Sequence, residues 1–372
     1  MDDINKCFME KIIEKLERET TPLTSSVERD EFITASEVAF DCRFDGTSTF
    51  YPWKMPTKLP EKFGIGVIVG SSGSGKSTIL KQFGVEEQPI WEYNKSIVSH
   101  FDNPDDAINK LGSVGLNSIP SWYKPYHVLS NGEKFRADLA RKIKSNTVID
   151  EYTSVVDRNV AKAASVSLSK YVKNNKLENI VLSTCHHDIL DWLEPDWVLD
   201  TDTGELLDGF FFVRPKINIE IYQTSYSAWG MFKDHHYLDH NINKASRCYV
   251  AMWDGIIVGF IATITQPSGS VKNGWRGHRA VVLPEFQGVG LGVRMIEAVA
   301  QIHLEQGHRF FSRTAHPRMI WYMENSIAWK GTSKNKKLRK DIPIGAMYKE
   351  HFYDNKRLCG SHEYIGEIKK EI

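Results

Sequence analysis

The sequence feature that most constrains the fold is GSSGSGKST, residues 70–78. It follows the apolar stretch GIGVIVG, which indicates a short buried strand, and it opens a helix. The spacing of Gly70, four residues, Gly75, Lys76 and Ser77 is that of a P-loop, in which backbone amides close around phosphate groups. Lys76 is expected to reach the β- and γ-phosphates, and the hydroxyl of Ser77 to ligate magnesium. The stretch therefore predicts a nucleoside triphosphate site between a strand and a helix.

The pattern around this loop predicts a whole domain. From Gly64 to about Gly209, apolar runs such as NTVIDEY and NIVLSTC alternate with helical segments, which indicates a parallel sheet and an α/β fold. With 372 residues, the chain is long enough for two domains. We predict an N-terminal helix at 1–24, an α/β P-loop domain at 25–212, an α+β domain at 213–330 and a basic C-terminal extension at 331–372.

Composition sets broad limits on function. The chain has 47 basic and 47 acidic residues, so any basic surface must be local. Its five cysteines form no Cys-x-x-Cys pair, which argues against a disulfide framework or a thiolate zinc site. No run of about 18 apolar residues occurs, and MDDINKCFMEKIIEKLERET has the pattern of a charged amphipathic helix and not of a secretory signal. We expect a cytoplasmic protein without a membrane span.

Three further motifs narrow the class of the P-loop domain. In TVIDEYTSVVD, Asp150 and Glu151 follow an apolar strand. Asp150 suits the surroundings of a magnesium ion, and Glu151 suits a base for the attacking water or a residue that positions it. The stretch HVLSNGEKFRADLARKI places residues 129–133 at the head of a helix, where amides and a hydroxyl make a second anion site. IVLSTCHHD ends a strand in two histidines followed by Asp188.

These motifs, in this order, resemble an ABC-type ATPase cassette over roughly residues 30–205. In that family the LSGGQ-like signature of one cassette covers the ATP of another, which implies an ATP-dependent homodimer. The signature here reads LSNGE, and no glutamine loop is found because Gln88 follows Lys76 too closely. With no membrane span, the family's transport role has no support. Soluble members typically act on nucleic acid or the ribosome.

The resemblance assigns roles to single residues. Glu151 is the implied catalytic base, and Asp157 lies in the implied loop between protomers. The switch histidine falls on His187, with the adjacent His186 as the alternative. An aromatic side chain before the P-loop is expected to stack on adenine, and two candidates precede it. The residues implied to bind ATP are Tyr51 or Trp53 together with Gly70, Ser71, Ser72, Gly73, Ser74, Gly75, Lys76, Ser77, Thr78, Ser130, Gly132 and Asp157.

A second glycine-rich stretch, VVLPEFQGVGLGVRM, also joins a strand to a helix. A dinucleotide fingerprint is one interpretation, but no fitting third glycine accompanies Gly288, Gly290 and Gly292, and no suitably placed acidic residue follows. The turn has neither a lysine nor a hydroxyl, which suits a pyrophosphate that is held and not cleaved. Upstream, CYVAMWDGIIVGFIATI predicts a hairpin around an Asp-Gly turn.

HRAVVLPEFQGVGLGVRMIEAVA resembles the acetyl-CoA loop of the GNAT acyltransferases, and the match extends over about residues 218–325. The family's Arg/Gln-x-x-Gly-x-Gly/Ala pattern falls on Gln287, Gly290 and Gly292. The upstream hairpin matches the family's strands two and three, and FFSRTA matches strand five. Amides at the start of the helix are expected to point at the pyrophosphate. The residues implied to bind acetyl-CoA are Val282, Leu283, Gln287, Gly288, Val289, Gly290, Leu291 and Gly292.

Catalytic residues for acyl transfer are less clearly indicated. The reaction needs a base for the proton of the nucleophile and an acid for the leaving thiolate. The candidates are His316, Tyr322, His278 and Glu285. Histidine has a suitable pKa, and tyrosine is the common acid of the GNAT family. An alternative for Tyr322, in MIWYMENSIAW, is a place in the hydrophobic core.

The stretch KDHHYLDH predicts a helix with two histidines, His236 and His240, one turn apart. They could chelate a metal, although no third ligand is evident, or belong to a solvated face. Together, HHYL, HRAVVLPEFQGVGLG and SRTAHPRM resemble the Mom-type phage DNA-modifying branch of the GNAT fold. That resemblance implies an acceptor pocket lined by His236, Tyr237, Ser312 and His316.

A basic cluster closes the sequence argument. WKGTSKNKKLRK has six basic and no acidic residues from Lys330 to Lys340, which suits contacts to phosphates, or else a solvated loop. We predict an ATPase joined to an N-acyltransferase that modifies a nucleic-acid base, using ATP, Mg²⁺ and acetyl-CoA or a related acyl donor. The alternatives are an ATP-gated nucleic-acid clamp with a non-catalytic GNAT fold and an N-acetyltransferase for a protein or a small amine.

Overall fold

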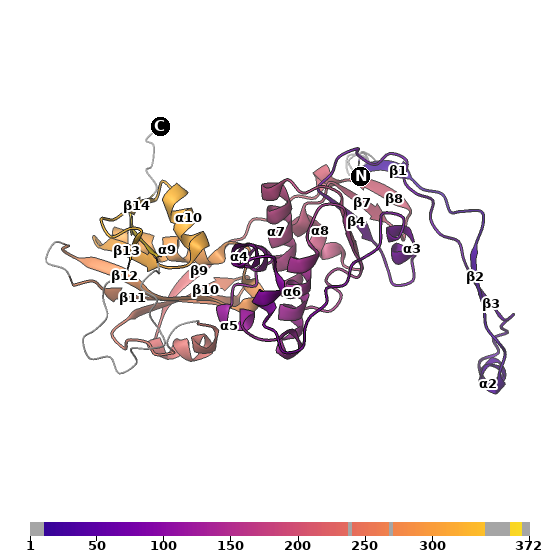
Figure 1. The fold of residues 1–372 in the computed structure, drawn as a ribbon, viewed down its shortest axis with the longest axis horizontal. Coiled ribbons are helices and arrows are strands. Elements are labelled where there is room, and N and C mark those ends of the chain that lie inside the picture. Colours follow the sequence, from indigo (N-terminus) through magenta and orange to yellow (C-terminus); the bar gives the residue numbers. More distant parts are fainter. Residues whose placement is uncertain (1–10, 237–239, 268–270, 339–357, 367–372) are drawn as a thin grey trace. The chain divides into compact units, whose positions relative to one another are not determined.

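A computed structural model describes residues 11–236, 240–267, 271–338 and 358–366. The chain divides into two compact units (Figure 1). One comprises Met1–Leu116 and Ser121–Pro215, and the other comprises Asn117–Pro120 and Lys216–Ile372. The division after Pro215 lies close to the boundary predicted from the sequence, between residues 212 and 213. Each unit has a sheet and a hydrophobic core of its own.

The first unit is built from short strands and helices. In chain order they are β1 (Ile12–Lys15), β2 (Leu23–Ser26), α2 (Glu31–Phe40), β3 (Thr47–Phe50), β4 (Ile65–Val69), α3 (Lys76–Leu80), α4 (Pro104–Ser113), α5 (Ile119–Trp122, at the boundary of the units), α6 (Asn131–Lys142), β5 (Thr147–Ile149), α7 (Arg158–Asn175), β6 (Ile180–Thr184), α8 (Leu190–Leu193), β7 (Trp197–Asp200) and β8 (Glu205–Asp208). Single 3₁₀ turns are η1 (Ile97–His100), η2 (Tyr126–Val128), η3 (His187–Ile189) and η4 (Gly209–Phe211).

The main sheet of the first unit has the strand order β1-β8-β7-β4-β6-β5. Strands β4 to β7 pair in parallel, which confirms the parallel sheet expected from the alternating pattern. All five residues of β4 are buried, as expected for a strand covered on both faces. Gly66 allows β4 to pass under the indole of Trp197, because a Cβ there would lie 2.0 Å from that ring.

The helix predicted at the N-terminus is wrong over the residues that the structure describes. Ile12–Lys15 forms β1, the edge strand of the sheet, which pairs antiparallel with β8. Leu16, which follows, is buried in the core of this unit. Apolar residues at positions 12, 13 and 16 fit a helix face, but the open edge of β8 supplies backbone hydrogen bonds that favour a strand. Residues 1–10 lie outside the described residues.

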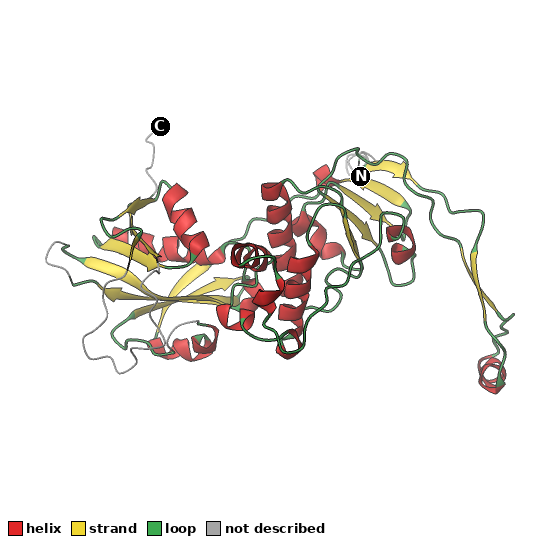
Figure 2. Ribbon diagram, in the orientation of Figure 1, coloured by secondary structure: helices red, strands yellow, loops and turns green. Residues whose placement is uncertain are grey.

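An arm also departs from the predicted pattern. Strands β2 and β3 form a separate antiparallel ribbon, and helix α2 connects their far ends (Figures 1 and 2). The sequence analysis predicted no helix between residues 25 and 50. Asp30 caps α2 by accepting a hydrogen bond from the backbone N–H of Ile33 at 2.8 Å. We call residues 23–50 the arm.

The second unit is an α+β structure. Its elements are β9 (Glu220–Thr224), β10 (Arg247–Trp253), β11 (Ile256–Thr265), β12 (Gly274–Val282), α9 (Leu291–Glu305), β13 (Arg309–Thr314), α10 (Pro317–Asn325), β14 (Trp329–Gly331), β15 (Lys337–Leu338) and β16 (Leu358–Tyr364). Single 3₁₀ turns are η5 (Tyr226–Met231), η6 (Lys233–His235) and η7 (Pro284–Phe286).

The sheet of the second unit runs β14-β16-β13-β12-β11-β10-β9, with β15 paired to β16. The predicted hairpin is confirmed as β10 and β11. Its turn uses positive φ at Asp254 (49°) and Gly255 (77°), the conformation that an Asp-Gly turn supplies. Strands β12 and β13 pair in parallel over Gly274–Arg276 only, although β12 continues to Val282 along β11.

The predicted end of this domain at residue 330 is also wrong. Strand β16 lies inside the sheet, between β13 and β14, and pairs antiparallel with both. The sequence analysis missed this strand because its sequence, LCGSHEY, is short and mostly polar and follows a lysine-rich stretch. Residues 331–338 and 358–364 therefore belong to the fold of the second unit and are not an appended tail.

Candidate functional site

The P-loop connects β4 to α3 through a turn that only glycine allows. Gly70 and Gly75 have φ of 153° and 99°, in the region that L side chains avoid. A Cβ on Gly70 would lie 2.2 Å from Oγ1 of Thr201, so this position also has no space for a side chain. Ser74 closes the turn by donating its hydroxyl to the carbonyl of Ser71 at 2.8 Å. The predicted strand–loop–helix is thus built as the motif requires.

Lys76 and Asp202 hold the loop from opposite sides. Nζ of Lys76 donates to the carbonyls of Gly70 and Ser71 at 2.9 and 2.6 Å. The carboxylate of Asp202, in the β7–β8 turn, accepts from the backbone N–H of Ser71 at 2.9 Å and from its hydroxyl at 2.6 Å. These hydrogen bonds, more than the nearby charges, hold the pKa of Asp202 below its usual value. Sequence reasoning missed Asp202, which follows the loop by 131 positions.

Ser77 and Asp150, the two residues predicted to hold magnesium, are hydrogen-bonded to each other. Burial alone raises the pKa of Asp150, but hydrogen bonds from the hydroxyls of Ser183 and Ser77 outweigh it and lower the pKa. The carboxylate is therefore ionised at neutral pH. A hydroxyl beside an ionised carboxylate is a pair of hard oxygen donors, and this donor set fits Mg²⁺. The hydroxyl of Ser183 also accepts from the backbone N–H of Glu151 at 3.1 Å.

Glu151 and the two histidines lie at the ends of β5 and β6. Glu151 is exposed and has a φ of 49°. His187 places Nε2 3.5 Å from a carboxylate oxygen of Asp200, the last residue of β7. His186 instead places Nδ1 3.1 Å from the hydroxyl of Thr153, and burial lowers its pKa. The structure thus separates the two histidines, with His187 beside the strand that leads to Asp202.

Tyr51 and Trp53, the aromatic residues before the P-loop, were predicted as candidates to stack on adenine, and they differ in exposure. Trp53 is only 9% exposed and its indole N–H donates to the carbonyl of Thr201. The guanidinium of Arg18 lies 3.5 Å from the centre of its ring, so Trp53 is a core residue whose faces are covered. Tyr51 is exposed, but Phe50, which was not predicted, lies against the loop: a Cβ on Gly75 would be 2.6 Å from its ring.

The signature stretch caps helix α6. Ser130 accepts from the N–H of Glu133, and the carboxylate of Glu133 accepts from the N–H and hydroxyl of Ser130 at 2.9 Å each. This capping box explains a glutamate at the end of LSNGE. Burial raises the pKa of Glu133, but the hydrogen bonds from Ser121 and Ser130 lower it overall. Asp157 likewise caps α7, through the N–H groups of residues 159 and 160.

The second glycine-rich turn connects β12 to α9. Gly288 and Gly290 have φ of 97° and 96°, and Gly290 is the residue before the helix. The side chain of Gln287 ties the turn to the strand by donating to the carbonyl of Val282 at 2.9 Å. Leu291 is buried and anchors the first turn of the helix. The N–H groups of that turn lie at the amino end of a fifteen-residue helix. This position favours an anion.

Three predicted acyl-transfer residues lie on β13 and α10. Ser312 is buried on β13, and His316 precedes α10, where burial lowers its pKa. Within the described chain, Nδ1 of His316 has no hydrogen-bond partner. The hydroxyl of Tyr322 donates to Glu297 of α9 at 2.8 Å, and burial followed by this carboxylate raises its pKa.

The residues predicted to line one acceptor pocket are not gathered on one face. Gly259 of β11 faces α9, since a Cβ there would lie 2.3 Å from Met295. Its neighbour Phe260 faces the other way and contacts Trp229, whose ring also meets that of His236. Phe310 of β13 packs in a cluster with Tyr364 and with residues of α9. Ser312 is two residues further along the strand and therefore lies on the same face. His236 and Ser312 are therefore on opposite faces, because side chains alternate along strands.

The histidine-rich stretch is not the predicted helix in its described part. Lys233–His235 is a single 3₁₀ turn, and His236 has extended backbone angles. His240 lies 3.8 Å from the carboxylate of Asp234, and both are exposed. Among the residues that the structure describes, no three His, Cys, Asp or Glu side chains form a cluster able to hold a metal ion. Tyr237 lies outside the described residues.

His362 is a residue that the sequence did not single out. It is 1% exposed on β16, directly opposite Ser312 of β13. Neither of its ring nitrogens has a hydrogen-bond partner among the described residues, which is rare for a buried polar group. Burial, and to a lesser degree Lys336, lowers its pKa against the opposing effect of Glu324. Only the pairing of β16 with β13 brings it to this place.

Comparisons with known proteins divide the chain in the same way. Residues 216–319 match the model of the acetyltransferase (GNAT) family. No curated protein matches the chain. Among solved structures, a Bacillus subtilis acetyltransferase in complex with CoA is 12% identical, with 40% of this chain and 98% of that chain covered and a TM-score of 0.29. The Escherichia coli ribosomal-protein-S18-alanine N-acetyltransferase is 12% identical (42% and 99% covered, TM-score 0.30).

A dimeric ATP-binding cassette bound to ADP and Pi is 14% identical, with 52% of this chain and 94% of that chain covered and a TM-score of 0.34. In the first unit, β4 leads into the P-loop and lies between the parallel strands β7 and β6. The second unit carries a GNAT-family domain at residues 216–319. The described residues contain no helix with the length and apolar character needed to cross a membrane.

Proposed function

We propose that this protein hydrolyses ATP as a homodimer and transfers an acyl group from acetyl-CoA, or a related acyl-CoA, to a nucleic-acid base. The observation that carries the proposal is the presence of two glycine-capped anion sites in one chain. The first, at Gly75, has a lysine, a hydroxyl and a carboxylate beside it. The second, at Gly290, has only backbone and apolar groups, and lies within the GNAT match.

Each residue of the first site has a distinct task in ATP hydrolysis. Lys76 would exchange its carbonyl partners for the β- and γ-phosphates, and the N–H of Ser71 would do the same when Asp202 releases it. Ser77 and Asp150 would hold Mg²⁺, which neutralises phosphate charge when bound. Glu151 would accept a proton from the attacking water or orient it, and His187 would sense the γ-phosphate.

A homodimer would complete this site. Ser130 and Gly132 lie at the amino end of α6, whose first N–H groups favour an anion. The resemblance to ABC-type cassettes assigns this signature stretch to the ATP that is bound by a second copy. Asp157, which caps α7, would lie beside that shared surface.

Glu151→Gln tests the ATPase assignment. The amide keeps the shape of the side chain but cannot accept the proton, so ATP turnover should fall by roughly a hundredfold or more while ATP binding persists. Phosphate release and sedimentation with ATP are the measurements, and a closed dimer should accumulate. Glu178→Gln, at an exposed carboxylate of the same unit, is the control. Unchanged turnover in Glu151→Gln would remove the role given to Glu151.

Acyl transfer would take place where β12 and β13 part. Within the described chain, the parallel pairing of β12 with β13 ends at Arg276, and an extended ligand would lie along the part of β12 that follows. The acceptor nitrogen attacks the thioester carbonyl, the C–N bond forms and the C–S bond breaks. The acceptor's proton passes to a base, for which His316 is the candidate because burial keeps it neutral. Tyr322, with a raised pKa, would protonate the leaving thiolate.

Calorimetry with acetyl-CoA and CoA tests the donor. Both should bind with a Kd in the micromolar range, because a helix N-terminus and an open strand edge serve the pyrophosphate and the pantetheine arm. Titration of the full chain with and without ATP gives the measurement. If neither ligand binds at high micromolar concentration, the acyltransferase proposal is lost while the ATPase proposal stands.

The nucleic-acid acceptor rests on the basic stretch and on the type of cassette. Lys330, Lys334, Lys336 and Lys337 are all exposed, and Lys336 is paired with Glu324 at 3.0 Å. Such lysines contribute salt-dependent contacts to phosphates. Mass spectrometry of nucleosides from cells with and without the protein is the test. A base heavier by one acyl group is expected in DNA or RNA, and identical spectra would remove the nucleic-acid acceptor.

A second candidate function is an ATP-gated clamp whose GNAT fold binds but does not catalyse. It is favoured by the hydrogen bond of Tyr322 to Glu297, which also accepts from the indole N–H of Trp329 at 3.1 Å. A hydroxyl held in this way is less free to reach a thiolate. The clamp predicts ATP-dependent retention of nucleic acid with no consumption of acetyl-CoA, whereas the leading proposal predicts release of free CoA thiol.

A further inference from the structure

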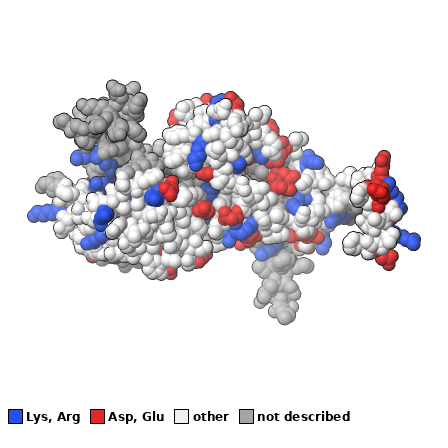
Figure 3. Space-filling model, turned by 90° about the horizontal axis from the view of Figure 1, so that it is seen from below, with Lys and Arg blue, Asp and Glu red and all other residues white. Residues whose placement is uncertain are grey.

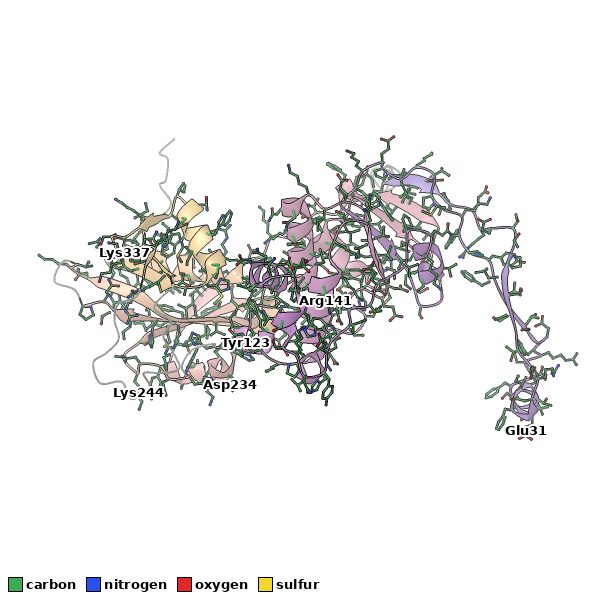
Figure 4. All side chains as sticks on the ribbon, viewed as in Figure 1. Glu31, Tyr123, Arg141, Asp234, Lys244 and Lys337 are labelled. Carbon is green, nitrogen blue, oxygen red and sulfur yellow. The ribbon has the colours of Figure 1, made fainter. Side chains whose placement is uncertain are left out.

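The arm ends in a helix that has no core to pack against. Helix α2 connects β2 and β3 at their far ends, and none of its ten residues is buried (Figure 1). Glu31, labelled in Figure 4, begins this helix. A helix of this length is not stable in water by propensity alone, so either local contacts or a partner must support it. We call residues 27–46 the arm tip.

The polar groups of the arm tip are satisfied within the tip itself. Glu37 forms an ion pair with Arg29 and accepts from the backbone N–H of Phe44 at 2.7 Å. Asp30 caps the start of the helix, and Asp45 accepts from the N–H of Thr47 at 2.9 Å. The bonds of Glu37 connect the helix to the segments that flank it, and the bond of Asp45 reaches the start of β3. The tip is therefore a preformed unit and needs no partner for its polar groups.

The apolar groups of the same tip are not satisfied. Phe32 is 73% exposed, and Val38 and Phe40 are each 81% exposed. Single exposed apolar side chains are common on proteins, but at 3.6 residues per turn Phe32 and Phe40 lie on the same side of this ten-residue helix, whereas Val38 lies on another side. Aromatic anchors on a rigid element are the feature that dominates the binding energy of protein interfaces. The tip is thus built to insert apolar side chains into another surface.

The charge of the arm selects the kind of surface that it can meet. Residues 23–50 contain six acidic and two basic residues, a net charge of −4. Because acidic and basic residues number 47 each, the rest of the chain carries +4. Acidic side chains are prominent at the end of the arm in Figure 3. Like charge disfavours nucleic acid and anionic membranes as partners, whereas the remainder of a second copy has the complementary charge.

The root of the arm is fixed beside the nucleotide site. Phe50, the last residue of β3, lies against Gly75 of the P-loop. Arg18, before the arm, donates to the carbonyl of Tyr51 at 2.9 Å and stacks on Trp53. The ribbon therefore leaves the first unit from a rigid base. A tip held in this way loses little conformational freedom on binding, which favours association.

We propose that the arm tip docks on the surface of a second copy of this chain, in an exchange where each copy gives one arm and receives one. Such an exchange closes as a two-fold symmetric dimer, because the same surfaces are used on both copies. It deepens the homodimer of the proposed function with a contact that does not require ATP. The ATP-dependent contact would use the signature stretch, and the arm would keep the two copies together between ATP cycles.

Sedimentation equilibrium without nucleotide tests the contact in the full chain. Replacing both phenylalanines, Phe32→Ser and Phe40→Ser, should raise the dimer Kd roughly a hundredfold, given the apolar area of two buried aromatic side chains per arm. The matched control replaces Val85 and Phe210 with Ser, which are 87% and 82% exposed outside the arm. The control should change Kd less than about twofold. A wild-type chain that is monomeric without ATP at high micromolar concentration overturns the proposal.

Cys42 offers a test of location. It is exposed at the end of α2, and Cys185 is the other exposed thiol in the described chain. In a chain with Cys7 and Cys185 replaced by Ser, a photo-crosslinker on Cys42 should give a product of twice the chain mass that peptide mapping places between copies. The product should disappear with Phe32→Ser/Phe40→Ser. Crosslinks only within one copy overturn the proposal.

Lys76→Ala distinguishes this contact from ATP-driven closure. That variant should lose the ATP-dependent dimer and keep the nucleotide-free dimer and its Cys42 crosslink. The double phenylalanine variant should do the reverse and still close when ATP and Glu151→Gln are combined. If Lys76→Ala abolishes the nucleotide-free dimer, the arm does not act as proposed, and the ATPase proposal is untouched.

Discussion

The two glycine-rich turns of this chain share a backbone and differ in their side chains. Gly75 precedes α3 with φ 99° and ψ 14°, and Gly290 precedes α9 with φ 96° and ψ 10°. Both follow a buried or half-buried strand and aim the N–H groups of a helix outward. The same backbone conformation thus precedes both helices, and we propose that each turn is an anion site. The difference between the sites lies in the side chains that surround each.

The first turn is supplied with reactive groups, and the second is not. Lys76 and Ser77 begin α3 at the P-loop, and Asp202 and Asp150, which follow β7 and β5, contact the loop and Ser77. At the second turn, the polar side chain is that of Gln287, and it is bonded to the carbonyl of Val282. Backbone amides bind an anion, but they cannot ligate a metal or neutralise a leaving phosphate. We therefore propose that the second turn holds its anion, whereas the first also supports cleavage of a phosphate bond.

Lys76→Ala should give the largest effect and act on one site only. Without the ammonium group, ATP turnover should fall by about a hundredfold or more, because a charge on the transferred phosphate is left unneutralised. The Kd for acetyl-CoA should not change. Phosphate release and acetyl-CoA calorimetry on the same preparation are the measurements. A parallel loss of acetyl-CoA binding would show that the two sites are not separate devices.

Gly290→Ala is the complementary change. A side chain at φ 96° strains the helix start, and the strain should weaken acetyl-CoA binding about tenfold while ATP turnover persists. Gly307→Ala is the matched control, because Gly307 has φ 76° at the other end of α9 and open space around its Cβ position. The control carries a similar strain away from the turn. Equal losses in both variants would assign the effect to helix stability and not to the turn.

The pH dependence of α9 is an effect of comparable size, on stability and not on binding. Burial, followed by the charges of His308 and Arg247, lowers the pKa of His303 to about 4. The unfolded histidine has a pKa of about 6.5 and takes up a proton first, so stability is full above this value and is lost as pH falls toward 4. Between pH 7.5 and 5 the wild type should lose about 2 kcal/mol more than His303→Gln.

Hydrogen exchange over α9 measures this loss without assuming that both units unfold together. The imidazole of His303 lies 3.0 Å from the hydroxyl of Thr263, and glutamine can keep a hydrogen bond there. His316→Gln provides a comparison on another helix, since burial also lowers its pKa. If wild type and His303→Gln change in parallel with pH, the neutral imidazole does not stabilise α9.

Ser130→Ala should have the smallest effect on stability. Ser130 caps α6 at the proposed anion site of the signature stretch. Removing its capping box should cost about 1 kcal/mol of stability at the start of α6. Asn103→Ala removes the equivalent cap of α4 and should cost a similar amount. ATP turnover should fall in Ser130→Ala only. Equal turnover in the two variants would exclude a special role for Ser130.

The parts predicted from sequence share one property, namely that their determinants are local. The P-loop, the parallel strands, the Asp254-Gly255 hairpin and the strand–turn–helix at Gly290 each depend on residues within about ten positions. The P-loop brace by Asp202 and the pairing of His362 with Ser312 depend on partners far along the chain. No periodicity in a single segment contains that information.

Two errors have the same physical origin. Ile12, Ile13 and Leu16 have helical spacing, but backbone pairing with β8 stabilises a strand there instead. KDHHYLDH has two histidines at helical spacing, but in its described part His236 turns inward to the ring of Trp229. In both cases a tertiary contact outweighed a weak local preference. The arm shows the opposite case, in which a helix forms although none of its residues is buried.

The place of β16 has a consequence for synthesis on the ribosome. The first unit has every strand of its main sheet once β8 has emerged. In the second unit, β13 and β14 are made early, but the strand that joins them, β16, follows some twenty-five residues after β14. Until it emerges, β13 has an unpaired edge that can pair wrongly or aggregate. Production of this unit therefore depends on how fast the lysine-rich stretch between β14 and β16 is translated.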